Sequence, residues 1–107
     1  MKLITAIVNK DDSNAVQSGL TGEGFQVTRL ATTGGFLMAG NVTFMMAVDD
    51  ERVDQAIEIV KTHSRQRKEL VPSTASYGMG VSSAFPIEVT VGGATIFVQN
   101  IERFEKV

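Results

Sequence analysis

Residues 6–20, AIVNKDDSNAVQSGL, and residues 46–60, MAVDDERVDQAIEIV, follow one pattern, and this pattern decides the fold. Each stretch has an apolar strand segment, then an acidic pair, then an amphipathic helix that leads toward another apolar segment. Acidic residues are favoured at a helix N-terminus because the backbone dipole is positive there. The repeat therefore predicts two β-α-β units in series, which is typical of an α+β, ferredoxin-like (split βαβ) sheet with helices on one face.

The expected elements extend outward from this repeat. Strands are predicted over residues 3–8, 25–30 and 42–48. The first helix is expected to begin at an N-cap among Asp11, Asp12 and Ser13 and to end at Gly22 or Gly24. The second helix starts at the acidic run 49–51, and its apolar stripe consists of Val53, Ala56, Ile57 and Val60.

Beyond the second helix, residues 87–91 and 94–101 read as two further strands. Gly92-Gly93 lies between them and predicts a two-residue hairpin turn. The charged stretch 65–69 and the Ser, Gly and Ala-rich segment 72–85 precede this hairpin, and the latter is expected to be a long loop. The expected fold is thus a ferredoxin-like sandwich with an added C-terminal hairpin.

The composition of the chain excludes several classes of function. The chain has 107 residues, which fits one domain over residues 1–107, and its formal net charge of −2 argues against binding to nucleic acid polymers or anionic lipid. It has no cysteine, so disulfides and thiolate chemistry are excluded, and one histidine makes metal catalysis unexpected. No apolar run is long enough for a membrane span or a signal-peptide core, so a cytoplasmic protein is expected.

The segment 31–41, ATTGGFLMAGN, has the composition of a nucleotide-binding loop. Its glycines allow backbone N–H groups to approach an anion, Phe36 and Leu37 offer a flat apolar surface, and Asn41 carries the donor and acceptor that adenine requires. The alternative is a β-loop-β connection whose apolar residues cap the core or a subunit contact. Neither a P-loop nor a dinucleotide fingerprint is present.

Four stretches together carry a more specific resemblance. They are KLITAIV (2–8), ATTGGFLMAGNVTF (31–44), DDERVDQAIEIV (49–60) and VGGATIFV (91–98). With them the chain resembles the cyclic di-AMP receptor family of PII-like signal proteins. The resemblance implies a homotrimer that binds one cyclic di-AMP in each cleft between neighbouring subunits and has no enzymatic activity. It also implies a short T-loop at 31–41 and a long B-loop at 72–85, whose ordering controls an unknown downstream protein.

The resemblance also assigns residues to the ligand. Thr28 is expected to bond the ligand, Phe36 to stack on a base, and Asn41 to read the adenine. The full set implied for ligand binding is Gln26, Thr28, Gly35, Phe36, Leu37, Asn41, Gly92, Gly93 and Phe97. The sequence departs from the family at three positions: Gly24 and Gln26 stand where the family carries Asn and Arg, and Ala47 stands where it carries glycine.

Three alternatives stay open at this point. The loss of the arginine at position 26 is compatible with a sensor of another adenine nucleotide, such as ATP. A scaffolding trimer with degenerate pockets is the second alternative. The third is a small acylphosphatase-like enzyme, which would require Arg29 beside Asn41 or Asn9.

Overall fold

The structure is a computed structural model that describes residues 1–32, 40–71 and 87–107. Strand β1 (Lys2–Asn9) leads into helix α1 (Lys10–Gly22), and strands β2 (Thr28–Thr32) and β3 (Asn41–Val48) follow. A 3₁₀ turn, η2 (Asp50–Arg52), then opens helix α2 (Val53–His63). The chain ends with strands β4 (Arg67–Val71), β5 (Ile87–Val91) and β6 (Ala94–Asn100) and a C-terminal tail.

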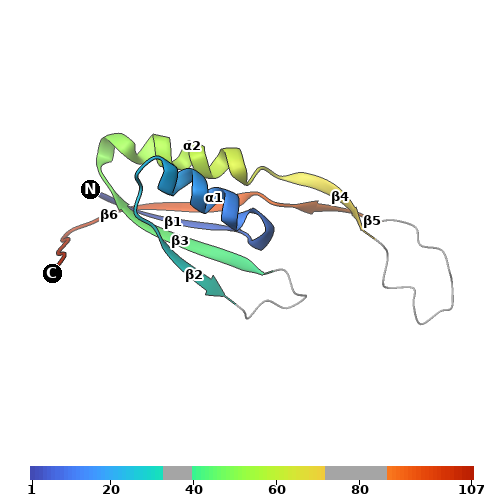
Figure 1. Cartoon of the computed structure of the whole chain (residues 1–107), viewed down its shortest axis with the longest axis horizontal. Coiled ribbons are helices and arrows are strands. Elements are labelled where there is room, and N and C mark those ends of the chain that lie inside the picture. Colours follow the sequence, from blue (N-terminus) through green and yellow to red (C-terminus); the bar gives the residue numbers. More distant parts are fainter. Residues whose placement is uncertain (33–39, 72–86) are drawn as a thin grey trace.

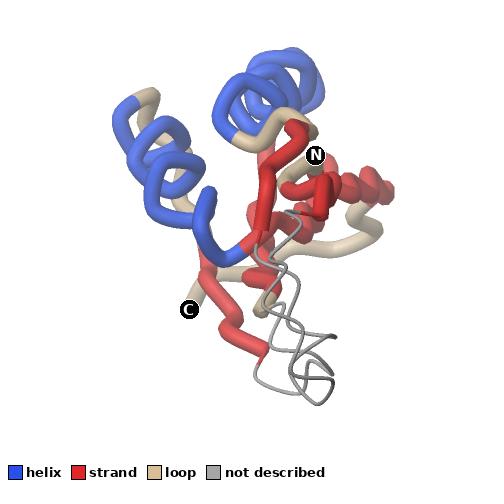
Figure 2. Tube along the Cα trace, turned by 90° about the vertical axis from the view of Figure 1, so that its right-hand side faces the viewer, coloured by secondary structure: helices blue, strands red, loops and turns tan. Residues whose placement is uncertain are grey.

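The main sheet has four strands in the order β2-β3-β1-β6, and each neighbouring pair is antiparallel. Both helices lie on the same face of this sheet (Figures 1 and 2). The order follows from two β-α-β units whose strands interleave, so the ferredoxin-like sheet predicted from the repeat is confirmed. Among the described residues, no helix covers the opposite face of the sheet, which we call the helix-free face.

The core lies between the helices and the sheet. Because side chains alternate along a strand, Ile4, Ala6 and Val8 face the helices and are at most 1% exposed. Val16 and Leu20 of α1 and Ala56 and Val60 of α2 complete this layer, as the helical spacing predicted. Ile57, which was predicted in the same stripe, is only partly buried, because it lies above the edge strand β6.

The start of α1 differs from the expectation. Asn9, rather than a residue among 11–13, is the N-cap, because its side chain accepts a hydrogen bond of 2.8 Å from the Asp11 N–H. Ser13 instead lies inside the helix, where its hydroxyl donates to the Lys10 carbonyl at 2.7 Å. The helix ends at Gly22 as predicted, and Gly24 follows with a φ of +85°.

The predicted hairpin between residues 87–91 and 94–101 is wrong. β5 pairs with β4 in a separate two-stranded sheet, and β6 pairs with β1 at the edge of the main sheet. Gly92 and Gly93 both have positive φ, yet they carry the chain from one sheet to the other. The hairpin therefore lies between α2 and β6, and we call β4 and β5 together the arm (Figure 1).

Strand positions shift in two further places. The second strand begins at Thr28 rather than residue 25, and Phe25, which precedes it, is buried in the core. Strand β4 occupies charged residues for which no strand was predicted. Lys68 on β4 forms an ion pair of 3.1 Å with Glu88 on β5, so the charges pair across the exposed arm.

Replacing Gly92 with alanine is expected to destabilise the protein. The residue has a φ of +82°, and a Cβ there would lie 2.6 Å from the Arg65 carbonyl oxygen. The left-handed conformation alone costs a residue with a side chain about 1–2 kcal/mol. Urea unfolding should show this loss, whereas Gly22→Ala, where a Cβ would meet nothing within 4 Å, should change stability little. Equal midpoints for both variants would contradict this explanation.

Candidate functional site

The helix-free face of the main sheet presents a row of side chains that spans all four strands. Thr28 lies opposite Met45, Met45 opposite Thr5, and Thr5 opposite Phe97. Phe97 is 51% exposed and Leu30, one row away on β2, is 45% exposed. An open sheet face with large exposed apolar side chains is typical of a surface that another molecule covers.

A hollow of about 630 Å³ lies at the β2 side of this face. Gln26 and Thr28, both implied as ligand residues, line it together with residues of β3 and the C-terminal tail. The other described lining residues are Leu3, Val27, Leu30, Met45, Met46, Ala47, Phe104, Glu105 and Lys106. Sequence patterns gave no signal for the tail residues, because residues 101–107 have no regular element.

The remaining implied residues lie elsewhere. Phe97 is on β6, at the opposite edge of the sheet, and Gly92 and Gly93 precede that strand. Asn41 begins β3, opposite Asn9 and Thr32. Gly35, Phe36 and Leu37 lie outside the described residues, as does the whole implied B-loop, residues 72–85.

Two edges of one sheet thus carry two separate groups of implied residues. Gln26 and Thr28 belong to the β2 edge, whereas Gly92, Gly93 and Phe97 belong to the β6 edge. Strands β3 and β1 lie between these edges, so three strand spacings, or about 14 Å, separate them. A single chain therefore does not bring the two groups together.

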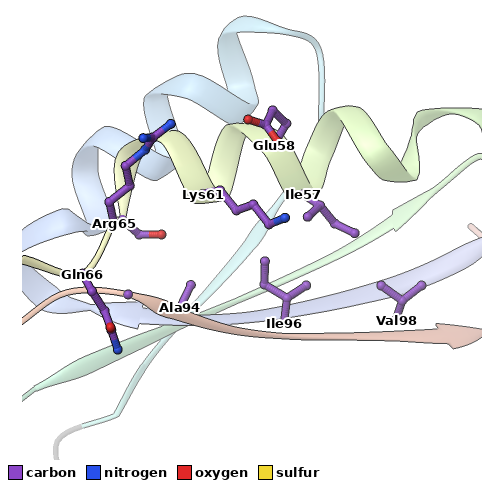
Figure 3. A pocket seen from close by; sticks show the side chains of 10 residues that line it. Ile57, Glu58, Lys61, Arg65, Gln66, Ala94, Ile96 and Val98 are labelled. Carbon is purple, nitrogen blue, oxygen red and sulfur yellow. The ribbon is translucent and has the colours of Figure 1, made fainter.

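A second hollow, of about 770 Å³, lies on the helix side between α2 and β6. Ile57 points from the helix toward the strand, and Ile96 and Val98 point up toward the helix (Figure 3). Lys61 and Arg65 supply positive charge at this hollow, and Gly93 lies in its wall. This hollow also runs along the β6 edge.

The arrangement that an acylphosphatase-like enzyme would need is absent from the described residues. Arg29 faces α1, where its guanidinium donates to Asn14, Gln17 and Ser13 at distances of 3.0, 2.8 and 2.9 Å. Asn41 belongs to the opposite face of the sheet by strand alternation, and the Asn9 side chain caps α1. Arg29 is therefore bound to the helix and does not meet either asparagine across a shared cavity.

The described residues contain neither a metal-binding cluster nor a membrane-spanning helix. Within residues 1–32, 40–71 and 87–107, no cluster of three or more His, Cys, Asp or Glu side chains could hold a metal ion. None of the described helices is both long and apolar enough to cross a membrane.

Comparisons with known proteins place the chain in a family. Residues 1–107 match the sequence model described as "Cyclic-di-AMP receptor". The fold is also similar to the crystal structure of a functionally unknown protein from Pediococcus pentosaceus, with a TM-score of 0.76 and 38% sequence identity. That alignment covers 99% of this chain and 96% of the other. The chain therefore belongs to the cyclic di-AMP receptor family.

Proposed function

We propose that residues 1–107 form one receptor domain that binds cyclic di-AMP between the subunits of a homotrimer. The protein is a cytoplasmic signal-transduction protein without enzymatic activity. The observation that carries this proposal is the separation of the implied ligand residues onto the β2 and β6 edges of one sheet. Since about 14 Å separates these edges, one chain supplies two half-sites rather than a whole site.

A ring of identical chains joins the half-sites. Within the main sheet, β2 and β6 are the two edge strands, and each pairs with a single described neighbour. When the β2 edge of one copy meets the β6 edge of the next, the contact is head-to-tail, and such contacts close into rings when the rotation permits. Apolar side chains left exposed on one chain, including Leu30, Phe97 and Phe104, support burial between copies.

The ligand is recognised by stacking, hydroxyl and backbone groups. Phe36 and Leu37 cover the base and Asn41 reads the adenine edge, while Gly35 presents its backbone N–H to the ligand. Thr28 and Gln26 bond the ligand from the β2 edge of the neighbouring copy. Gly92, Gly93 and Phe97 lie at the pocket floor. Ordering of the loops at 31–41 and 72–85 then alters the surface that a downstream protein meets.

Thermal unfolding in the presence of nucleotides tests the proposal. A ligand that binds only the folded trimer stabilises it by about 2.7 kcal/mol at a concentration one hundred times its Kd. Cyclic di-AMP should raise the melting temperature, whereas cyclic di-GMP and AMP should not. A melting temperature that no nucleotide moves at millimolar concentration would remove the sensor function and favour a scaffolding trimer.

The same thermal-unfolding experiment also tests the second candidate function, which is a sensor of another adenine nucleotide. Gln26 is neutral and lines the hollow at the β2 edge, where a family arginine would supply positive charge. A larger shift with ATP than with cyclic di-AMP would favour this candidate.

A further inference from the structure

The arm, β4 with β5, is fastened to the rest of the protein by an ion pair at its base. Arg67 Nη2 lies 3.1 Å from Asp12 Oδ1, and Arg67 Nη1 lies 3.2 Å from Asp12 Oδ2. A two-pronged contact of this kind fixes direction as well as distance. The Asp12 side chain is 10% exposed, so its charge depends on the guanidinium for compensation.

The other strand of the arm is held at the same place. Gly93 N–H donates to the carbonyl of Ser64, which is buried at the end of α2. A Cβ on Gly92 would lie 2.7 Å from Arg67 Nη1 and 3.3 Å from Asp12 Oδ2. The ion pair therefore packs directly against the backbone at Gly92, where the chain leaves β5. Both strands of the arm are thus anchored beside the first turn of α1.

The arm needs such an anchor. A two-stranded ribbon by itself is at best marginally stable in water. Leu70 of β4 is 68% exposed and Ile87 of β5 is 46% exposed, so these side chains gain little from packing within one chain. The direction of the arm is therefore decided by the few polar contacts at its base.

The first turn of α1 also contacts the implied T-loop, at its C-terminal end. The N–H of Lys10, which lies two residues before Asp12 in the same helical turn, donates to the Gly40 carbonyl at 2.9 Å. Gly40 is the last residue before β3 and closes the segment 33–39. One helical turn is therefore bonded both to the end of the T-loop and to the base of the arm, whose strands precede and follow residues 72–86.

We propose that Asp12 and Arg67 form a clamp that sets the direction of the arm against α1 and couples the arm to the Gly40 end of the T-loop. Asp12 is a positioning residue in this proposal and does not touch the ligand. The coupling to ligand rests on the proposed function, whereas the clamp itself does not.

Amide hydrogen exchange without nucleotide tests the clamp directly. Asp12→Asn and Arg67→Gln are each expected to speed exchange in β4 and β5 by about tenfold, while the protected amides of β1 and β3 keep their rates. The double variant should be no faster than either single one, because both substitutions remove the same interaction. Lys68→Gln, which breaks the Lys68–Glu88 pair inside the arm, is the matched control and should leave exchange at the base unchanged.

Three results would overturn the clamp: unchanged β4 and β5 exchange in both single variants, effects that add in the double variant, or an equal effect of Lys68→Gln. Arg67 is 40% exposed, so Arg67→Gln keeps the test valid if Asp12→Asn fails to fold. Calorimetry with cyclic di-AMP then tests the coupling, with affinity expected to fall about tenfold in Arg67→Gln. Fast arm exchange in the variants of a protein that binds no nucleotide would support the clamp and contradict only the proposed function.

Discussion

Two variants that each fail to bind cyclic di-AMP are expected to regain about a quarter of the binding sites when their chains are mixed within trimers. Thr28→Glu damages the proposed half-site at the β2 edge, and Phe97→Glu damages the proposed half-site at the β6 edge. Each places a carboxylate beside a dianionic ligand, and an unfavourable like-charge contact of this kind costs several kcal/mol. Each variant alone should therefore show no binding at micromolar ligand.

Mixing restores sites because each variant keeps the half-site that the other has lost. In randomly assembled trimers, half of the chains supply an intact β2 edge and half supply an intact β6 edge, so about one junction in four is intact. Unfolding and refolding the two variants together, followed by calorimetric titration, measures this fraction. Native mass spectrometry of the refolded mixture reports whether mixed trimers have formed.

The matched control combines Gln26→Glu with Thr28→Glu, which both alter the β2 edge. No chain in that mixture has an intact β2 half-site, so no site should recover. Mixed trimers of Thr28→Glu and Phe97→Glu could also fail to bind cyclic di-AMP. In that case the ligand site lies within one chain and the head-to-tail arrangement is wrong.

The main sheet could be predicted because local patterns and tertiary burial agree there. Ile4, Ala6 and Val8 alternate with less buried residues along β1, and Val16 and Leu20 repeat at the helical spacing on α1. Each pattern indicates which face of its strand or helix is buried. All of these faces are buried together when the helices lie on one side of the sheet. The resemblance to the cyclic di-AMP receptor family then indicates the class of ligand.

Long-range pairing could not be predicted from the same patterns. Gly92-Gly93 between two alternating segments looks the same whether those segments pair with each other or with distant strands. The decision depends on β1, which offers β6 a seven-residue register, while β5 finds its partner in the charged strand β4. For the same reason, the family resemblance implies a ligand role for Thr28 and Phe97 without revealing that they lie on opposite edges of the sheet.

Replacing Gln26 with arginine is expected to tighten cyclic di-AMP binding by ten- to a hundredfold. Gln26 lines the hollow at the β2 edge and is exposed on the single chain, so a longer side chain is accommodated there. A hydrogen bond to a charged partner contributes about 1.5–3 kcal/mol, which corresponds to that range of affinity. Isothermal titration calorimetry on the assembled protein measures the change, and ATP affinity should gain less if the proposed cleft fits the cyclic dinucleotide.

The cation that β2 itself carries does not supply the charge that is missing at position 26. Arg29 faces α1, where Ser13, Asn14 and Gln17 hold its guanidinium, and strand alternation directs it away from the hollow. Thr21→Arg adds the same charge at the end of α1 and serves as the control for long-range attraction, which should change affinity little at physiological salt. Gln26→Lys should gain less than Gln26→Arg, because an ammonium lacks the planar fork that binds phosphate in two places. Equal gains for Thr21→Arg and Gln26→Arg would mean that net charge, and not a contact at position 26, limits affinity.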